Sequence, residues 1–524
     1  MAYIPSPHVT QNWIVSKPSA RGRRGIVVAQ AGSAAEAGIA ILDAGGNAVD
    51  AAVATALALA AVEPWNSGLG GIGFALVHRA GEPRAEVVDF GPVAPRRLNP
   101  SFFRLTGRMK QDLFAWPEVE GDANIHGPLS FAIPSAAAGY AHMHAAWGKL
   151  PLHEVMAPAI ALAKRGLPQD WYTTLKVAAS ASVLRRYPES ARIYLPDGLP
   201  PIAPYQGKPG FLRLGGLAAT LEQLAKAGLR DLYEGEVARS IAADVSEMGG
   251  VLSADDLRSC QARVLPATQF PWRGHKLQLA GGLTAAPTMI RVLEQMTSVR
   301  AGARPDAGWY AALSRALKNA YAERLAGLGD AEPRTAETCT THLTVCDQEG
   351  TMVAMTSTLL SSMGSRVVLP KSGILMNNGV MWFDPRPNQA NSIGGGKRPL
   401  TNMSPIILRT GDRPWFAAGA SGGRRILAAV TQLMAFVTDF AMGLEEAAHH
   451  LRIDVSDPDY LSVDYRLPRD VIDALASEGQ TEVVEHGVMP INFACPNVIV
   501  SNEDGSRAGI SDVASPWSAA LSQT

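Results

Sequence analysis

Three consecutive residues, Thr340-Thr341-His342, are the part of the sequence best suited to chemistry. They open an apolar hairpin pattern and follow a polar, turn-rich stretch. A threonine hydroxyl is a poor nucleophile until a base lies beside it. If the chain were cut before Thr340, the new α-amine would be that base. The sequence therefore predicts an N-terminal threonine nucleophile that is made by processing.

A pair of threonines in a strand is ordinary by itself, because threonine suits the pleated surface of a sheet. Two further features favour the chemical interpretation. The returning strand carries Thr356-Ser357-Thr358, and a glycine turn, Gly419-Ala420-Ser421-Gly422-Gly423, lies downstream. Backbone N–H groups at a Gly-Gly turn can point at a developing oxyanion, which hydroxyl attack on an amide requires. Gly422 and Gly423 are therefore a candidate oxyanion hole, and the same turn can begin the helix that follows.

His342 is adjacent to the threonine pair, but we do not expect it to be the general base. Side chains alternate between the two faces of a strand, and on this ground we expect His342 to point to the face opposite the nucleophile and to be structural. His449 and His450 lie in a helical pattern. Adjacent residues do not share a helix face as i,i+4 ligands do, so we assign this pair to packing or to the surface.

The elements that must position Thr340 form a predicted hairpin. Apolar and polar residues alternate over 343–346 and again over 352–356, and Asp347-Gln348-Glu349-Gly350 lies between them as a turn. With these four residues as the turn, Thr340 is expected near Ser357-Thr358. Thr358 is then expected to hydrogen-bond the Thr340 hydroxyl.

Two helices are predicted near the start of the chain. Ser33-Ala34-Ala35-Glu36 is a capping-box pattern, so it is expected to open a helix that Gly45-Gly46 ends. A second helix is expected between Asn47 and Pro64. Gly68-x-Gly70-x-x-Gly73 then leads into a predicted strand over 74–78. A dinucleotide-binding turn follows a strand and opens a helix, whereas this run does the reverse, so we favour close packing or a pocket loop over a nicotinamide site.

The remaining pattern indicates a layered fold. Residues 134–250 are mainly helical in pattern, and Asp306 is placed to cap a later helix that ends near Leu325. The polar stretch from Gly327 to Thr338 is predicted to be an exposed loop. Strands and helices follow one another without regular βαβ alternation, so the sequence predicts an α+β fold.

Composition indicates a soluble globular protein: of 524 residues, 47% are hydrophobic and 18% are charged. The formal net charge is -1 and no Lys/Arg run has the length of a nucleic-acid patch. We therefore expect a small-molecule partner, and neither nucleic acid nor a membrane. The most apolar run, 48–62, contains Asp50 and is shorter than the about 20 residues that a membrane span needs.

Four cysteines, Cys260, Cys339, Cys346 and Cys495, are too few and too scattered for a disulfide framework, and none has zinc-site spacing. We expect reduced thiols, no metal and no cofactor. Residues 1–24 include basic residues but no apolar core of a secretory signal, which favours a cytoplasmic location.

The sequence resembles the γ-glutamyltranspeptidase family, which consists of self-processing hydrolases with an N-terminal nucleophile. The resemblance extends over most of the chain, and its motifs are specific together although each alone is weak. The matching segments are 41–53, Leu69-Gly70-Gly71, 340–342, 372–378, Lys397-Arg398-Pro399-Leu400, Met403-Ser404-Pro405 and Gly422-Gly423. The resemblance implies a four-layer αββα sandwich.

The resemblance also implies that the proenzyme cuts itself between Cys339 and Thr340. Residues 1–339 would form a large subunit and residues 340–524 a small one, held together as an α/β heterodimer in one globular unit. Pairing of two such heterodimers is left open. Thr340 would be the nucleophile with Thr358 in support, and Gly422-Gly423 would form the oxyanion hole. An acyl-enzyme ester on Thr340 would then react with water or with an amine.

The departures from the family pattern concern the substrate. Gly91 stands where the family usually has an arginine that holds the γ-glutamyl α-carboxylate, and Leu360 replaces an asparagine. Gly379 and Trp382 replace the glutamine and aspartate that hold the substrate α-amine. Each lost charged or hydrogen-bonded partner costs on the order of 1.5 to 3 kcal/mol, so an amide other than γ-glutamyl is expected.

Thr401 and Asn402 stand in place of two serines, which is a milder change. The candidate substrate-binding residues are Gly91, Asn378, Gly379, Trp382, Thr401 and Asn402. The candidates for binding a substrate carboxylate are Arg96, Arg97, Arg386, Arg424 and Arg425, of which none is favoured singly.

These departures, with residues 382–387, resemble the divergent amidohydrolase branch of the family, which includes oxamate amidohydrolase and glutaryl-type cephalosporin acylases. The leading hypothesis is a self-processing amidohydrolase or acyltransferase that hydrolyses a small carboxylate-bearing amide through an acyl-enzyme on Thr340. The alternatives are a true γ-glutamyltransferase or glutathione hydrolase, an oxamate- or glutaryl-cephalosporin-type acylase, and a non-catalytic binding protein that keeps the fold.

Overall fold

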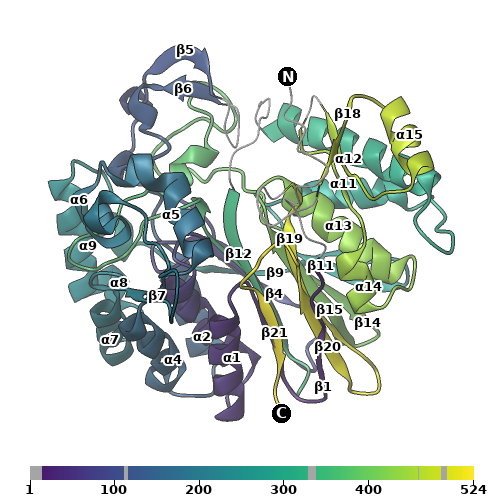
Figure 1. Cartoon of the computed structure of the whole chain (residues 1–524), viewed down its shortest axis with the longest axis horizontal. Helices are drawn as coiled ribbons and strands as arrows, with labels where there is room; N and C mark the ends of the chain where they lie inside the picture. Colours follow the sequence, from purple (N-terminus) through teal and green to yellow (C-terminus); the bar gives the residue numbers. More distant parts are fainter. Residues whose placement is uncertain (1–14, 111–115, 329–337, 458–459, 486–491) are drawn as a thin grey trace.

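Two seven-stranded antiparallel sheets lie face to face between two groups of helices (Figure 1). The computed structural model describes residues 15–110, 116–328, 338–457, 460–485 and 492–524, with the backbone alone at 325–328 and 338–339. The four layers are helices, sheet, sheet and helices. This arrangement is the αββα sandwich that the resemblance implied.

The first sheet contains the predicted hairpin at its centre. Its strands, in spatial order, are β21 (Ala519–Ser522), β2 (Ile26–Ala29), β12 (Thr338–Cys346), β13 (Met352–Ser361), β3 (Ile72–His78), β4 (Glu86–Phe90) and β9 (Arg263–Pro266). The order of the second sheet is β1 (Ala20–Gly22), β20 (Arg507–Ser511), β19 (Cys495–Ser501), β15 (Arg413–Ser421), β14 (Ile406–Thr410), β11 (His275–Leu279) and β10 (Thr268–Trp272).

Helices from the first half of the chain pack on the first sheet. They are α1 (Gly32–Asp43), α2 (Ala48–Val62), α3 (Ala136–Trp147), α4 (Leu152–Arg165), α5 (Trp171–Leu184), α6 (Pro188–Tyr194), α7 (Leu217–Ala227), α8 (Asp231–Glu234), α9 (Glu236–Glu247) and α10 (Ala254–Arg258). The helices on the second sheet are α11 (Ala286–Met296), α12 (Ala307–Leu328), α13 (Arg425–Thr438), α14 (Leu444–His449) and α15 (Arg469–Ser477).

The structure also contains three small sheets and several 3-10 turns. Three small sheets are formed by β16 (Ile453–Asp454), β17 (Leu461–Asp464) and β18 (Thr481–Val484), by β5 (Leu105–Met109) with β6 (Pro117–Val119), and by β7 (Leu167–Pro168) with β8 (Phe211–Leu212). The 3-10 turns are η1 (Pro100–Phe102), η2 (Glu120–Asp122), η3 (Pro128–Ser130), η4 (Pro196–Gly198) and η5 (Gly379–Trp382).

The alternation of side chains along the strands builds three apolar layers. In β12, Leu343 and Val345 pack toward the α1–α2 side, whereas Cys346 joins the layer between the sheets. In β15, Ala417 faces the inter-sheet layer and Ala418 faces the helices of the second group. Since each sheet is covered on both faces, its central strands are apolar on both faces away from the site.

Most of the predicted elements are confirmed, and the corrections concern where elements begin and end. Helix α2 begins after Asn47, whose side chain forms a capping box with Asp50. The capping box expected at Ser33 is wrong, because α1 begins at Gly32 with Ala31 as N-cap and no side-chain cap bond. Asp306 does cap α12, since its Oδ1 accepts the Trp309 N–H at 2.8 Å.

Helix α12 continues to Leu328, three residues beyond the end expected for it. The exposed loop predicted from Gly327 to Thr338 falls mostly on 329–337, outside the described residues, and Thr338 already belongs to β12. The glycine run after α2 leads into β3 as predicted. A Cβ at Gly70 would clash with the backbone of Leu375, so close approach of two backbones explains at least that glycine.

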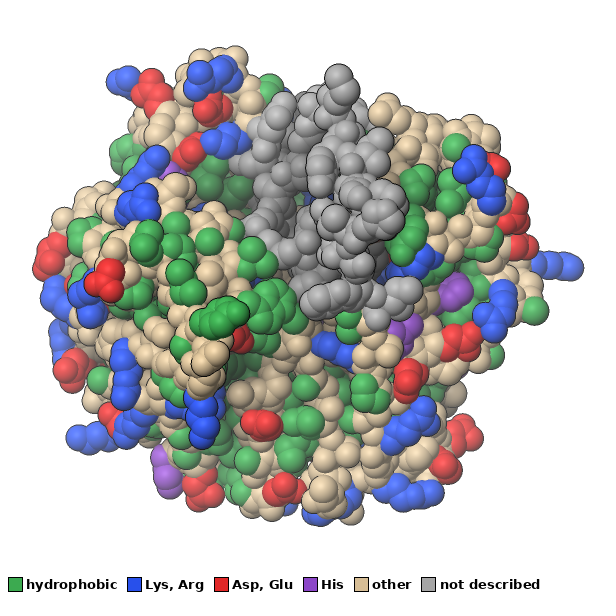
Figure 2. All heavy atoms as spheres, viewed as in Figure 1, with side chains coloured by type: hydrophobic (Ala, Val, Ile, Leu, Met, Phe, Trp, Pro, Cys, Tyr) green, Lys and Arg blue, Asp and Glu red, His purple; other side chains and the backbone are tan. Residues whose placement is uncertain are grey.

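On the face drawn in Figure 2, acidic and basic side chains of the described residues are interspersed. No large patch of a single charge sign is seen among them on this face. Among the helices that the structure describes, none is both long and apolar enough to cross a membrane.

Candidate active site

Thr340 lies at a bulge between β12 and β13. Cys339 pairs with Leu360 and Thr341 pairs with Ser357, so two residues of β13, Thr358 and Leu359, lie opposite Thr340. A bulge of this kind breaks the ladder and turns a side chain away from the regular pleat. Thr340 as a whole residue is 5% exposed, so the predicted nucleophile is buried.

The hydroxyls of Thr340 and Thr358 are 3.1 Å apart, which confirms the expected hydrogen bond. The Thr358 hydroxyl also accepts the N–H of Leu360 at 2.8 Å. Leu360 has a φ of +87°, which is strained for a leucine. The backbone is therefore bent at the residue that fixes the Thr358 hydroxyl.

A buried polar network lies behind the nucleophile. The Thr341 hydroxyl is 2.6 Å from Oε2 of Glu63 and 2.9 Å from Oε1 of Gln30. The Gln30 amide in turn donates to the Ser421 hydroxyl, and Asn66 donates to the other Glu63 oxygen at 2.7 Å. Burial raises the pKa of Glu63 to about 7.

The donors and acceptors in this network depend on where the protons of Glu63 and Thr341 lie. A hydroxyl has one proton to donate, so Thr341 cannot donate to both Glu63 and Gln30. With Glu63 protonated, Glu63 donates to Thr341 and the Thr341 proton goes to Gln30; with Glu63 ionised, Thr341 donates to Glu63 and the Gln30 amide must turn to donate to Thr341. In the protonated state the hydrogen bonds run from Glu63 through Thr341 and Gln30 to Ser421, the residue before the glycine turn.

The predicted orientation of His342 is wrong. His342 and Thr340 are two residues apart and share a face of β12, because their partners Thr356 and Thr358 are also two residues apart on β13. Its Nδ1 contacts the Thr356 hydroxyl at 2.9 Å and its Nε2 the Thr344 hydroxyl at 3.1 Å. Burial lowers the pKa of His342 to about 3. The ring is therefore neutral and fully engaged, as a structural residue would be.

Gly422 and Gly423 follow β15 and precede α13, with φ values of +138° and +59°. A Cβ at Gly419 would clash with the His342 ring, and two residues later Ser421 reaches Gln30. From Gly419 to Ser421, β15 therefore runs toward the end of β12 that carries Thr340, and the glycine turn follows at that end. The turn also begins a 14-residue helix, whose first backbone N–H groups favour negative charge.

Three predicted substrate residues lie in one buried segment. The Asn378 amide donates to the Ile125 carbonyl at 2.8 Å and to the Ser361 hydroxyl at 2.7 Å. The Gly379 N–H bonds to the Asn377 side chain, and Trp382 packs in the layer between the sheets. Asn378 is thus committed to protein contacts that hold the loop beside the end of β13.

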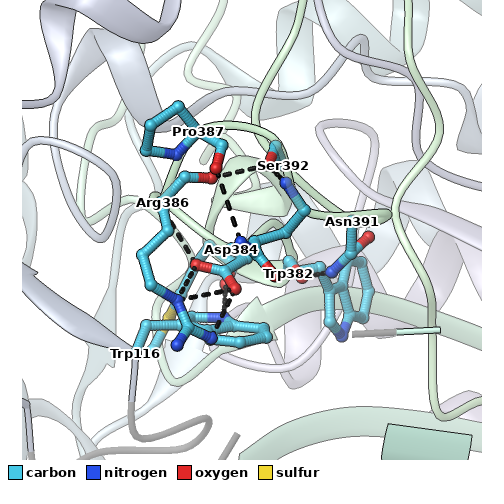
Figure 3. A network of polar contacts seen from close by, with 9 residues as sticks. Trp116, Trp382, Asp384, Arg386, Pro387, Asn391 and Ser392 are labelled. Atoms are coloured by element: carbon cyan, nitrogen blue, oxygen red, sulfur yellow. Dashed lines mark hydrogen bonds and ion pairs between the residues drawn. The ribbon is translucent and has the colours of Figure 1, made fainter. Parts of the chain in front are cut away.

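The segment continues into an ion pair that is drawn in Figure 3. The Asp384 carboxylate accepts from Arg386 at its backbone N–H (2.8 Å), at Nε (3.0 Å) and at Nη2 (2.6 Å). The guanidinium of Arg386 is therefore bound to Asp384 within its own loop. Of the other arginines considered as carboxylate ligands, Arg96 and Arg97 are exposed.

Thr401 and Asn402 are held from the last part of α12. The Arg324 guanidinium donates to the Thr401 carbonyl at 2.6 Å and to Oδ1 of Asn402 at 3.3 Å. Its other terminal nitrogen donates to the Thr284 carbonyl at 2.9 Å. Burial lowers the pKa of Arg324 to about 10. The Thr401 hydroxyl bonds to the Leu283 carbonyl at 3.0 Å, at the edge of a cavity between the sheets.

Gly91 has no room for a side chain. A Cβ there would lie 2.5 Å from the Phe74 ring and 3.0 Å from Nη2 of Arg398. In the sequence Arg398 is only part of a matching motif, whereas in the structure its guanidinium lies beside Gly91. Glu63 and Gln30 were also missed as site residues, although an acid directly after a helix as apolar as α2 was an available signal.

The described part of the chain contains no group of three or more metal-binding side chains. Cys260, Cys346 and Cys495 are free and buried. Burial raises the pKa of Cys260 to about 12 and that of Cys346 to about 11, so these thiols are not activated nucleophiles.

Comparison with known proteins gives a consistent set of relatives. The profile of the family described as gamma-glutamyltranspeptidase matches residues 34–338 and 331–520. The chain is 30% identical over 546 residues to the Acylase ACY 1 proenzyme of Pseudomonas sp. (strain SE83), covering 97% of this chain and 95% of that protein. It is 28% identical over 553 residues to the glutathione hydrolase proenzyme of Escherichia coli (strain K12), covering 94% of this chain and 90% of that protein.

Solved structures agree on the fold. The crystal structure of cephalosporin acylase from Bacillus halodurans superposes with a TM-score of 0.83 at 24% identity and covers 99% of both chains. The gamma-glutamyltranspeptidase of Helicobacter pylori gives a TM-score of 0.50 at 27% identity over 57% of this chain and 82% of that one. The four-layer fold of N-terminal-nucleophile hydrolases is thereby confirmed for this chain.

Proposed function

This chain belongs to the gamma-glutamyltranspeptidase family and is a hydrolase or acyltransferase that acts on amide C–N bonds, and on that premise we propose that Thr340 is its nucleophile. The observation that carries the proposal is the Thr340–Thr358 hydroxyl pair, 3.1 Å apart at a buried bulge. A threonine hydroxyl needs a base to act as a nucleophile, and the histidine closest in sequence, His342, is hydrogen-bonded to other threonines.

The base that we propose is the α-amine of Thr340 itself. It becomes available when the bond between Cys339 and Thr340 is cut, and its ordinary pKa of about 7.7 to 8.0 suits proton transfer near neutral pH. Two relatives are named proenzymes, which supports processing of this chain. Residues 1–339 and 340–524 would then be the two subunits of one heterodimer.

The acyl-transfer cycle is then as follows. The Thr340 hydroxyl oxygen bonds to the substrate's acyl carbon while its proton passes to the α-amine. The Gly422-Gly423 N–H groups stabilise the oxyanion, the C–N bond breaks, and the leaving amine takes the proton from the α-ammonium. The ester on Thr340 is finally cleaved by water or by an acceptor amine, and the hydroxyl is restored.

The substrate that we propose is an amide whose acyl group carries a carboxylate without the γ-glutamyl amine. The relative named Acylase ACY 1 supports an acylase activity, and the loss of side chains at Gly91 and Gly379 supports weak binding of a γ-glutamyl head group. The second candidate is glutathione or γ-glutamyl hydrolysis, which the similarity to the glutathione hydrolase proenzyme of Escherichia coli favours.

Mass spectrometry of the purified protein tests processing. A fragment that begins at Thr340 is expected, and Thr340→Ala is expected to stay full-length while Thr340→Ser is cut. A wild-type chain that stays intact on ageing would refute the nucleophile assignment. Turnover of γ-glutamyl-p-nitroanilide, oxamate and glutaryl-p-nitroanilide then separates the two candidate substrates, because efficient turnover of the first alone would favour the second candidate.

A further inference from the structure

A series of buried hydrogen bonds crosses the first sheet beside the nucleophile. It begins at Glu63, directly after α2, and passes through Thr341 of β12 and Gln30 at the end of β2 to Ser421 of β15. We refer to these four side chains as the Glu63 relay. Each of the four residues is at most 9% exposed. The activity proposed above uses none of their side chains, although the relay ends at the residue before the glycine turn.

The two ends of the relay lie on opposite faces of the first sheet. Thr341 points toward α1 and α2, as Leu343 does two residues later. Ser421 points into the layer between the sheets, as Ala417 does four residues earlier. Thr340 points into the same layer, because adjacent residues of a strand point to opposite faces. The relay therefore connects the helix side of the sheet to the side that carries the nucleophile.

With Glu63 protonated, the hydrogen bonds of the relay all point toward Ser421. Glu63 donates to Thr341, Thr341 donates to Oε1 of Gln30 at 2.9 Å, and the Gln30 amide donates to the Ser421 hydroxyl. The Ser421 oxygen is then an acceptor, and its own proton is left over. Among the described residues, Gln30 is the one hydrogen-bond partner of the Ser421 side chain, so this proton is available to a bound substrate.

With Glu63 ionised, the directions reverse. A carboxylate only accepts, so Thr341 donates to it and the Gln30 amide must turn to donate to Thr341. The carbonyl oxygen of Gln30 then faces Ser421, which keeps the contact only by donating its own proton to Gln30. The loss of one proton at Glu63 thus removes a donor at Ser421.

The surroundings of Glu63 place this change near neutral pH. Burial raises the pKa of Glu63 to about 7, against smaller effects of Thr341, Lys176 and Asn66 that lower it. Lys176 of α5 is the charged side chain of the described residues that acts on Glu63. The other groups that face Glu63 are the neutral side chains of Thr341 on β12 and of Asn66 on its own loop.

We propose that Glu63 is a positioning residue, which decides through Thr341 and Gln30 whether the Ser421 hydroxyl can donate a hydrogen bond on the side of Thr340. The protonated arrangement is the active one, because the Ser421 proton then joins the N–H groups of the glycine turn in stabilising the oxyanion. Only hydrogen bonds change along the relay, and the proton that Glu63 loses passes to solvent. This inference rests on the proposed function, since it takes Thr340 as the nucleophile.

The pH dependence of turnover tests the relay in the processed protein. The probe is glutaryl-p-nitroanilide, or γ-glutamyl-p-nitroanilide if only that one is turned over. The measured quantity is the ratio of kcat in Glu63→Gln to kcat in wild type from about pH 5 to about pH 9. The amide of the variant does not titrate and can donate to Thr341 throughout, and the titration of the Thr340 α-amine cancels in the ratio. We expect the ratio to rise with pH by roughly three- to tenfold.

Two variants that break the relay separate its action from a direct effect of the charge on Glu63. Gln30→Met and Thr341→Val keep the carboxyl group and remove one link each. In either background, adding Glu63→Gln is expected to change kcat by the same factor at every pH. Thr341→Ser keeps the hydroxyl and is expected to keep the rise. A rise that persists in Gln30→Met would show that the charge acts directly, and would overturn the relay.

The matched control is Gln278→Met, which removes another buried glutamine from a strand. Gln278 lies in β11, where its side chain contacts Nδ1 of His78 at 2.7 Å and accepts the Ala85 N–H at 2.6 Å. None of these partners belongs to the relay, so the rise is expected to remain in this background. If the control also lost the rise, the flat ratio in Gln30→Met would reflect disturbed packing, and the relay would be overturned.

Ser421→Ala removes the last group of the relay. It is expected to lower kcat at low pH and to have little effect at high pH, where the wild-type hydroxyl no longer donates to the substrate. A ratio for Glu63→Gln that is flat or falls with pH, or an equal effect of Ser421→Ala at every pH, would overturn this inference while the proposed function stands. An uncut protein that turns over neither anilide at any pH would instead overturn the proposed function.

Discussion

The Thr341 hydroxyl lies 2.6 Å from a carboxylate oxygen of Glu63, with both side chains buried. This contact joins the helix that covers the first sheet to the strand that carries the proposed nucleophile. Because Thr341 also contacts Gln30, which reaches Ser421, a change in the protonation of Glu63 alters hydrogen bonds up to the residue before the glycine turn.

Glu63 is predicted to make stability depend on pH. Burial raises its pKa from an ordinary 4.5 to about 7, so the folded state keeps a proton that the unfolded chain loses. Between pH 4.5 and pH 7 the unfolded state binds fewer protons, and stability falls as the pH rises. The total loss is on the order of 3 kcal/mol.

The measurement compares thermal midpoints of wild type and Glu63→Gln across this range. The amide keeps the shape and can still donate to Thr341, but it does not titrate. We expect the fall in midpoint from pH 5 to pH 8 to be smaller in Glu63→Gln than in wild type. Parallel curves for the two proteins would show that Glu63 does not titrate there.

Thr358→Val is predicted to slow both processing and turnover by about 10- to 100-fold. The change leaves the Leu360 N–H and the Thr340 hydroxyl without the oxygen that they now share. Thr358→Ser restores that oxygen and is the matched control, expected within a few-fold of wild type. Rates are followed by gel densitometry for processing and by anilide hydrolysis for turnover. Equal rates for the valine and serine variants would remove Thr358 from the site.

Gly422→Ala is predicted to lower both kcat and the thermal midpoint. Its φ of +138° is unfavourable for alanine, and the new Cβ would lie 2.6 Å from the Cβ of Ala494. Gly411→Ala is the matched control, because its φ is +56° but open space surrounds it in the turn between β14 and β15. The control is expected to lose about 1 kcal/mol of stability with kcat unchanged. If both variants kept the wild-type kcat, the glycine turn would have no part in stabilising the oxyanion.

Arg324→Met is predicted to raise KM and to destabilise the protein by about 2 to 4 kcal/mol. It removes the donors that hold the buried Thr401 carbonyl and the partly buried Asn402 side chain, and it leaves the Thr401 oxygen without this donor. Arg315→Met on the same helix removes an exposed ion pair with Glu478 and is expected to cost under 1 kcal/mol. Initial rates measure KM, and urea unfolding measures the loss of stability. A variant with unchanged KM would show that the 401–402 segment does not depend on Arg324.

The hairpin and the threonine pair could be predicted from sequence because they depend on local signals. Alternation over β12 and β13 fixes which residues can meet, and the Thr340–Thr358 contact follows from the position of the turn. The bulge opposite Thr340 was not predicted, since one extra residue in a strand leaves no pattern that alternation detects. The face of His342 was mispredicted because residues two apart lie on the same face.

The long-range contacts could not be predicted in the same way. Glu63, Gln30 and Ser421 meet Thr341 only because α2, β2 and β15 converge on β12, and no sequence periodicity encodes that convergence. Arg398 is likewise separated by more than three hundred residues from Asp89, with which it pairs. The family resemblance identified positions, such as Gly91, that lack the usual side chain. Only the three-dimensional structure shows that Phe74 and Arg398 fill the space at Gly91.

The strand order of the sheets has a consequence for the two pieces that scission would produce. In the first sheet β12 and β13, from the second piece, lie between β2 and β3 from the first, and β21 from the second piece forms the edge beyond β2. In the second sheet β1 and β11 of the first piece enclose four strands of the second. Neither fragment contains a complete sheet, so the two cannot separate with their sheets intact. Separating the two pieces requires both sheets to unfold. A piece that has been lost would then find no folded partner with which to re-form the sheets.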